Sequence, residues 1–237
     1  MPGKNLRLLG GYPLISYSII ASRLSKNIER TIVSTDSQGI KEIALRYGAS
    51  VPFLRPKEFA RDDSPDSEFV LHAINWFAEN EGNIPDYLVH LRPTTPLRDP
   101  QIIDLAITEM KKQVNATSLR SAHPASESPF KWFLRDEKGF FRGISNTYSN
   151  EQINMARHLF PTVYIPDGYV DVLKTSFIKE SKMLHGENIY GFLSPVCQEV
   201  DTLEDFEYLE FLIQKKSITI HDYLKNNYTV EIKHGRI

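Results

Sequence analysis

The chain has 237 residues, a length that suits one large α/β domain or one domain with a small appendage. Its 28 Lys and Arg against 30 Asp and Glu give a net charge of −2, so the charge balance indicates no nucleic-acid partner. No apolar run reaches the roughly 18 residues that a membrane helix needs. The one cysteine, Cys197, excludes an intrachain disulfide framework and a cysteine-based zinc site. These features indicate a cytoplasmic globular enzyme or binding protein without a membrane partner.

The first half of the chain alternates predicted helices with predicted strands. Apolar residues at helical spacing predict helices over Leu14–Leu24, Gly39–Tyr47, Ser67–Phe77 and Ile102–Lys112. Short apolar and β-branched runs predict strands at Thr31–Thr35, Val51–Leu54, Tyr87–Leu91 and Ala116–Ser121. Asp36 or Ser37 is suited to cap the second helix, and Gly48 to end it. This alternation predicts a Rossmann-like layered α/β domain with a mostly parallel sheet.

The second half is less regular. From His123 to Pro161 no period is sustained, which predicts an excursion from the main sheet with a hairpin around Lys138 and Gly139. Tyr169–Leu173 again resembles a strand. A helix is expected from Thr202 to about Lys215, with Thr202 as N-cap and Asp205 as a weak substitute for the acid of a capping box. The tail from Ile218 onward shows no clear pattern.

Two polar clusters near the start could bind a nucleotide. Lys4 and Asn5 follow Gly3, and backbone amides beside an ammonium can bind phosphate, although a solvated chain end gives the same pattern. Arg55 stands at the end of a predicted strand, where its planar guanidinium is suited to a phosphate or a base edge. A surface turn, with Asp63 or Ser64 capping the next helix, is the alternative.

Two further clusters lie later in the chain. The segment from Arg92 to Arg98 follows a predicted strand at the carboxyl edge of the sheet, where ligands bind in open α/β sheets. Its two hydroxyls and two guanidiniums favour an anionic ligand, and capping of the following helix is the alternative. Glu199 and Asp201, two apart in a strand, would present both carboxylates on one face, as a Mg²⁺ site requires. A solvent-facing pair before a helix cap would look the same.

Taken in chain order, these clusters resemble the acylneuraminate cytidylyltransferase (CMP-sialic acid synthetase) family. The matching stretches are PGKNLRLLGGYPLISYSI, TIVSTD, VPFLRPKEFARDD, LRPTTPLRDP, RHLFPTVYIPDGYVDVL and EVDTLEDF. The resemblance implies a single domain over residues 1–237 with the three-layer nucleotide-diphospho-sugar-transferase-type fold, and within it a dimerisation and sugar-binding excursion over residues 123–165. It also implies a reaction that joins CTP and a nine-carbon acidic 2-keto sugar, with Mg²⁺, to give a CMP-sugar and pyrophosphate.

The resemblance also assigns the nucleotide-binding residues. Lys4 and Asn5 match a family pair beside the phosphates and the nucleoside, and Lys4 is expected to take part in catalysis. Arg55 matches an arginine next to the cytosine, and Ser64 lies on the loop that closes over the base. Arg92 is expected at the nucleotide or sugar, in a turn where the family usually has glutamine.

The sugar and the metal are assigned in the same way. Lys131 and Arg157 match basic residues that face the acidic sugar, across the interface of an expected homodimer. Asp167 replaces the asparagine of a family Pro-Asn-Gly motif and is expected at the sugar. Glu199 and Asp201 match the paired aspartates that hold Mg²⁺, and Asp201 is expected to be catalytic.

The family has an apolar strand and a Gly-Ser-Lys-Gly phosphate loop before the position of Met1. The resemblance therefore implies a start upstream, and we expect the 237-residue chain alone to be poorly soluble or inactive. Three alternatives stay open: a truncated, non-catalytic nucleotide- or sugar-binding homologue, an enzyme like CMP-Kdo synthetase, and a GT-A-like glycosyltransferase, for which Asp62-Asp63 is a poor metal motif. The sequence does not choose among N-acetylneuraminate, legionaminate, pseudaminate and Kdo as the sugar.

Overall fold

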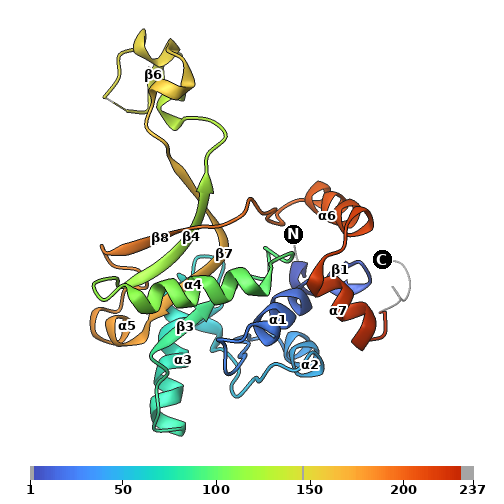
Figure 1. The fold of residues 1–237 in the computed structure, drawn as a ribbon. Helices are drawn as coiled ribbons and strands as arrows, with labels where there is room; N and C mark the ends of the chain where they lie inside the picture. Colours follow the sequence, from blue (N-terminus) through green and yellow to red (C-terminus); the bar gives the residue numbers. More distant parts are fainter. Residues whose placement is uncertain (1–2, 146, 231–237) are drawn as a thin grey trace.

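The computed structural model describes residues 3–145 and 147–230, and its centre is a four-stranded sheet (Figure 1). The strand order is β3 (Tyr87–His90), β7 (Tyr164–Lys174), β4 (Ser118–Pro124) and β8 (Ile189–Leu193). β7 is antiparallel to β3 and to β4, and β8 is parallel to β4. Three strands therefore share one direction, as expected for an α/β sheet. The prediction of mostly parallel pairing is nevertheless wrong, because β7 lies between β3 and β4.

Helices cover both faces of this sheet. On one face α1 (Leu14–Leu24) and α4 (Pro100–Lys112) pack on Leu119, Val170 and Val172. On the other face α3 (Asp66–Asn80) and α5 (Thr175–Ser181) bury Val70, Ile74 and Ile178 against Leu173. The result is the predicted three-layer arrangement, with the larger core between the sheet and α1.

The helix starts follow their capping residues. The hydroxyl of Ser37, rather than Asp36, accepts the amide of Ile40 at 3.3 Å and begins α2 (Gln38–Arg46). The carboxylate of Asp99 accepts the amide of Gln101 at 2.9 Å and begins α4. Thr202 and Asp205 form a complete capping box at the start of α6 (Leu203–Lys215), so Asp205 is a full member of that motif. Local sequence determines where these helices begin.

Two predicted strands, Thr31–Thr35 and Val51–Leu54, are wrong as strands. They are represented by one bridge between Ile32 and Ser50. The amide of Val33 donates to the Ser50 carbonyl at 3.0 Å, and the amide of Arg55 to the Thr35 carbonyl at 2.8 Å. The β-branched residues do favour extended backbone, but a strand also needs a ladder of consecutive pairs. Within the described residues these segments pair only briefly with each other.

Other elements were missed because each is short or lacks a strong pattern. The two-residue strands β1 (Leu8–Leu9) and β2 (Tyr12–Pro13) form a hairpin, and β8 forms one edge of the sheet. In the tail, α7 (Thr219–Asn227) buries Ile220 and Leu224 against the core around α1. None of the helices in the described ranges is long and apolar enough to cross a membrane.

Between β4 and β7 the chain leaves the body of the protein. Figure 1 shows this excursion projecting from the sheet, with the hairpin of β5 (Phe133–Arg135) and β6 (Phe141–Gly143) at its far part. Its turn contains Lys138 and Gly139, as predicted. Much of the excursion is apolar but exposed, including Trp132, Phe133, Leu134, Phe140, Phe141 and Leu159. The excursion therefore has a surface that a single chain leaves uncovered.

Candidate active site

The two predicted metal ligands precede α6 in an extended segment. Glu199 and Asp201 are exposed and Val200 between them is buried, with its amide donating to the Thr94 carbonyl at 2.8 Å. The prediction that this segment is a strand is wrong, because it makes an isolated contact with the turn after β3 instead of a ladder. The alternation of burial still leaves both carboxylates outside the core.

Three distant segments meet at these carboxylates. Lys4, in a short 3₁₀ turn (Lys4–Leu6), has its Nζ 3.1 Å from Asp201 Oδ1 and donates to the Val200 carbonyl at 2.7 Å. Thr94, in the turn after β3, donates its hydroxyl to Glu199 Oε1 at 2.9 Å. The structure thus brings together Lys4 and Asp201, the two predicted catalytic residues. An ammonium and two carboxylates now share one edge of the protein.

The pair of carboxylates fits a magnesium ion. Mg²⁺ commonly uses one or two protein carboxylates and completes its octahedron with water and substrate phosphates. Within the described residues there is no group of three or more His, Cys, Asp or Glu that could form an all-protein metal cage. Two exposed carboxylates beside a lysine match a site that a nucleotide's phosphates would complete.

The turn from Arg92 to Arg98 divides into an outer and an inner part. Thr95 and Arg98 are fully buried, so the expectation that both hydroxyls and both guanidiniums face a ligand is wrong. Arg98 donates to the carbonyls of Tyr169, Arg92 and Gly168 and to the hydroxyl of Ser18. Burial lowers the pKa of Arg98 to about 10, which leaves it charged at neutral pH. Arg98 fixes the turn, and Thr94 reaches the carboxylate site.

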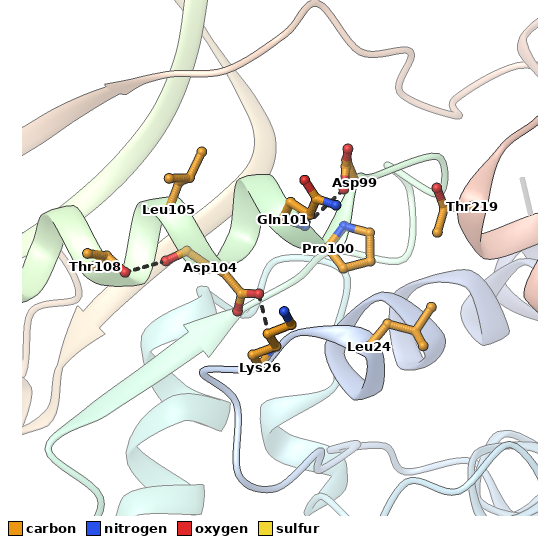
Figure 2. A pocket seen from close by; sticks show the side chains of 9 residues that line it. All are labelled: Leu24, Lys26, Asp99, Pro100, Gln101, Asp104, Leu105, Thr108 and Thr219. Atoms are coloured by element: carbon orange, nitrogen blue, oxygen red, sulfur yellow. Dashed lines mark hydrogen bonds between the residues drawn. The ribbon is translucent and has the colours of Figure 1, made fainter.

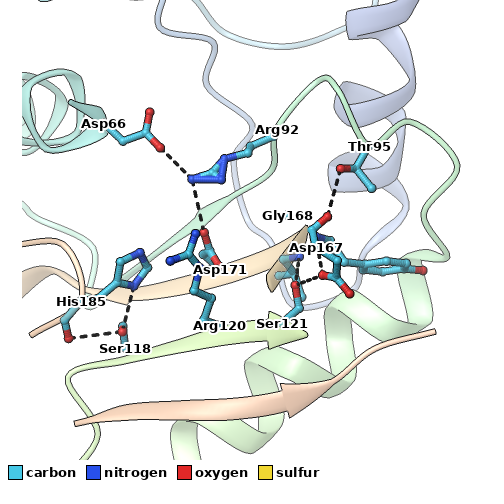
Figure 3. Close-up of polar contacts among 12 residues, drawn as sticks. Asp66, Arg92, Thr95, Ser118, Arg120, Ser121, Asp167, Gly168, Asp171 and His185 are labelled. Atoms are coloured by element: carbon cyan, nitrogen blue, oxygen red, sulfur yellow. Dashed lines mark hydrogen bonds and ion pairs between the residues drawn. The ribbon is translucent and has the colours of Figure 1, made fainter. Parts of the chain in front are cut away.

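Arg92 is engaged by two carboxylates (Figure 3). Its guanidinium lies 2.7 Å from Asp66, at the start of α3, and 3.8 Å from the buried Asp171 in β7. Asp171 also lies 3.7 Å from Arg120 in β4. Burial raises the pKa of Asp171, and the two guanidiniums oppose that rise. A direct contact of Arg92 with nucleotide stays a prediction.

Arg55 and Ser64 lie together near the start of α3. Arg55 is partly buried: its Nε donates to the Ser34 hydroxyl at 3.1 Å and a terminal nitrogen to the Ser34 carbonyl at 2.6 Å. Its guanidinium stands 4.4 Å from the centre of the Phe69 ring, and burial lowers its pKa. The Ser64 hydroxyl donates to the carbonyl of Glu58 at 3.2 Å, and Glu58 lies in the 3₁₀ turn Lys57–Phe59. The contacts of both residues with a base stay predictions.

We expect Arg55→Lys to weaken CTP binding by about tenfold or more, because an ammonium cannot reproduce a planar fork that bonds Ser34 and stacks on Phe69. Isothermal titration with CTP measures this loss. Arg61→Lys is the matched control, since Arg61 is exposed and its ion pair in the described structure is with the neighbouring Asp63. Equal CTP affinity in the Arg55 variant and the native protein would remove Arg55 from the nucleotide site.

Asp167 lies inside the protein. Its carboxylate accepts hydrogen bonds from Ser121 at 2.6 Å, from the amide of Tyr169 at 3.0 Å and from the hydroxyl of Ser194, and lies 3.1 Å from His123. Burial alone would raise the pKa of Asp167, but these hydrogen bonds together lower it. The carboxylate ties β4, β7 and the segment after β8 together, and its contact with a sugar stays a prediction.

Lys131 and Arg157 lie on the excursion, in the 3₁₀ turns Pro129–Lys131 and Arg157–Leu159, with the turn Gln152–Asn154 beside them. Lys131 donates to the Met155 carbonyl at 2.6 Å and stands over the Phe160 ring, and exposed Arg157 donates to the Ser126 carbonyl. Figure 1 shows the excursion projecting from the sheet, away from the N-terminus and α6. A single chain therefore does not place these two residues beside Lys4 and Asp201.

A cavity of about 580 Å³ lies elsewhere, between the end of α1 and α4 (Figure 2). None of the predicted site residues lines it. Its most polar member, Asp104, accepts hydrogen bonds from Ser25 and from the amides of Lys26 and Asn27. Asp104 thus holds the loop after α1 in place.

The three-layer α/β fold is similar to that of solved nucleotidyltransferases. A solved CMP:2-keto-3-deoxy-manno-octonic acid synthetase, in complex with CTP, matches the fold with a TM-score of 0.67 at 14% identity, over 91% of this chain and 93% of its own. The chain belongs to the cytidylyltransferase family, whose model matches residues 1–218.

Two curated relatives cover most of the chain. It is 40% identical over 223 residues to a CMP-N,N'-diacetyllegionaminic acid synthase of Legionella pneumophila, with 90% of each chain covered. It is 35% identical over 222 residues to a pseudaminic acid cytidylyltransferase of Campylobacter jejuni, again with 90% of each covered. The predicted family resemblance is confirmed.

Proposed function

We propose that this enzyme transfers the cytidylyl group of CTP to a nine-carbon acidic 2-keto sugar and releases pyrophosphate. The observation that carries the proposal is the meeting of Lys4, Thr94, Glu199 and Asp201 from three separate segments. Family membership gives this edge its chemistry, since the relatives named above form CMP-linked or cytidylylated nine-carbon acids. Among these sugars we propose a legionaminate-type acid, because that relative shares 40% identity.

In the proposed reaction the anomeric hydroxyl of the sugar attacks the α-phosphorus of CTP. The anomeric oxygen forms a bond to the α-phosphorus, and the hydroxyl proton passes to solvent. The bond from the α-phosphorus to the oxygen that bridges to the β-phosphate breaks, and pyrophosphate leaves with the electron pair. No covalent enzyme intermediate is needed, so catalysis consists of positioning and charge neutralisation. Lys4 would move from Asp201 to the phosphates. Glu199 and Asp201 would hold Mg²⁺, which supplies neutralisation of the phosphate charge.

The excursion supports a further part of the proposal, a homodimer. Its exposed aromatic surface needs a partner, and a second copy would bring Lys131 and Arg157 to the sugar carboxylate of its neighbour. An arginine suits that role because its guanidinium can bind a carboxylate with two parallel hydrogen bonds. We also propose a cytoplasmic location, since the single Cys197 is a free thiol.

We expect Phe141→Asp to convert the dimer to monomer and to abolish transfer to the sugar, because a charge would be buried in an apolar interface. Phe141 is 61% exposed in one chain. Sedimentation velocity measures the change. Phe211→Asp on α6 is the control, since that side chain is 50% exposed and lies outside the excursion. A Phe141 variant that remains dimeric and active would contradict the proposed interface.

The function itself is tested by pyrophosphate release from CTP and Mg²⁺ with a panel of acidic sugars: legionaminate, pseudaminate, N-acetylneuraminate and Kdo. The assay uses the 237-residue chain and, beside it, a chain to which the upstream strand and phosphate loop of the family are added. Release that depends on a nine-carbon acid, with the CMP-sugar identified by mass spectrometry, is the expected result for the extended chain. Release with Kdo alone would replace the substrate by an eight-carbon acid. Binding of CTP and sugar without release would favour a non-catalytic binding homologue and contradict the proposal.

A further inference from the structure

A row of polar side chains crosses the sheet at one register. His90 in β3 pairs with Asp171 in β7, Asp171 with Arg120 in β4, and Arg120 with Gly191 in β8. Side chains at paired positions point to the same face of a sheet. The same face carries the apolar Leu173, packed on α3 and α5, and the buried hydroxyl of Ser118. A charged row inside such a face calls for a specific explanation.

Arg120 is the least satisfied member of this row. Within the part of the chain that the structure describes, its guanidinium makes no hydrogen bond, and its buried Nε has no partner. The ionic neighbour of Nε is Asp171 Oδ1, 3.7 Å away; this oxygen is also buried and accepts no hydrogen bond within the described residues, and 2% of the Asp171 side chain is exposed. A guanidinium has five donors. Because 35% of the Arg120 side chain is exposed, its outer donors can meet a ligand.

The ion pairs around Arg120 contain as many carboxylates as guanidiniums. Arg92 and Arg120 face Asp66 and Asp171 (Figure 3). The two histidines of the cluster add no charge at neutral pH: burial lowers the pKa of His90 to about 4 and also lowers that of His185, which lies 3.1 Å from the Ser118 hydroxyl. These ion pairs therefore leave no positive charge over for a carboxylate or a phosphate, and the nearby charged Arg98 uses its donors on Ser18 and on backbone carbonyls. The cluster has unfilled donors, which suit an uncharged oxygen.

The row ends in open space at Gly191, and the turn that begins at Arg92 leads to the carboxylate site. A side-chain carbon added to Gly191, the neighbour of Arg120 in β8, would meet no atom within 4 Å. Arg92 stands two residues before Thr94, which bonds to Glu199 in the carboxylate site. A sugar whose anomeric hydroxyl lies at that site could extend along the turn toward Arg120.

We propose that Arg120 determines sugar specificity by donating to an uncharged oxygen acceptor of the sugar, either the carbonyl of an acylamino substituent or a hydroxyl, while Asp171 positions its guanidinium. This inference rests on the proposed function. It assigns the sugar carboxylate to Lys131 and Arg157 and a neutral substituent to Arg120. The carboxylate would then be bound by ion pairs, and the neutral substituent by a hydrogen bond.

The test compares Arg120→Met and Arg120→Lys with the native enzyme, using legionaminate, N-acetylneuraminate and the deaminated analogue that carries a hydroxyl in place of the acetamido group. We expect KM for the sugar to rise about tenfold or more in Arg120→Met, with KM for CTP unchanged, because a hydrogen bond from a charged donor is lost. Arg120→Lys keeps the charge and should give a smaller rise. Arg30→Met, which removes a surface arginine paired with Glu81, is the matched control.

The acceptor and the positioning role are separated by two further comparisons. A loss confined to the acetamido sugars would identify the acyl carbonyl, and an equal loss with the deaminated sugar would identify a hydroxyl. Asp171→Asn should raise the same KM without changing KM for CTP. Unchanged sugar KM in both Arg120 variants, or equal rises in both KM values, would overturn the inference. Native enzyme inactive with every nine-carbon acid would instead overturn the proposed function.

Discussion

Replacing Asp201 by asparagine should stop cytidylyl transfer while the protein remains folded. The substitution keeps the volume of the side chain and removes the charge that we assign to Mg²⁺ binding. A bound metal contributes several kcal/mol of charge stabilisation in the transition state, so we expect a loss in kcat of about a hundredfold or more. Folding should change little, because Asp201 is 70% exposed and an exposed ion pair with Lys4 contributes about 0–1 kcal/mol.

Pyrophosphate release and thermal unfolding, measured on the same preparation, check this expectation. Glu204→Gln is the control: it removes one negative charge three residues later, in the first turn of α6, from an exposed side chain that contacts neither Lys4 nor Thr94 in the described structure. That control should keep native activity and lose at most about 1 kcal/mol of helix stabilisation. Native turnover in Asp201→Asn would exclude this carboxylate from the mechanism.

The helices α1, α2, α3, α4 and α6 were predicted well because their signals are local, whereas α5 and α7 were missed. Ser37, Asp99 and Thr202 are capping residues whose side chains bond within three residues along the chain. The strand at Thr31–Thr35 failed for the opposite reason. Its residues favour extended backbone, but a ladder depends on a partner far away in sequence, and this information is absent from the segment itself.

The same difference between local and long-range information applies to the candidate site. Its motif residues were found by type and order, yet their meeting depends on contacts such as that of Lys4 with Asp201, which lie 197 residues apart. Arg120 and Asp171 were missed because each is a single charged residue within a predicted strand. A charge inside a buried strand is itself a signal, since it must be paired or used. Asp171 between Val170 and Val172 could have been recognised in this way.

Arg98→Lys should destabilise the protein more than any surface substitution. Arg98 is almost fully buried, and its Nε and terminal nitrogens bond to the carbonyls of Tyr169, Gly168 and Arg92 at 2.5, 2.8 and 2.6 Å. The single ammonium of lysine cannot occupy all these positions. The Arg92 carbonyl also accepts from the Ser18 hydroxyl and the Thr95 amide, so at least one of the Tyr169 and Gly168 carbonyls would be left unpaired, at a cost of about 1–3 kcal/mol. For a chain of this length the unfolding temperature should fall by about 5 °C.

The same substitution should also impair catalysis below the unfolding temperature, because Arg98 holds the Arg92 carbonyl against Gly168 and so orients the turn that carries Thr94 to Glu199. Calorimetry and steady-state kinetics at 20 °C separate the two effects, and Arg30→Met again serves as the surface control. If KM for the sugar rises while the dependence of the rate on Mg²⁺ concentration stays native, the kinetic effect of Arg98→Lys arises at the turn. An unfolding temperature equal to that of the native protein would show that the buried guanidinium is replaceable, and the turn would then owe its position to Pro93 and Pro96.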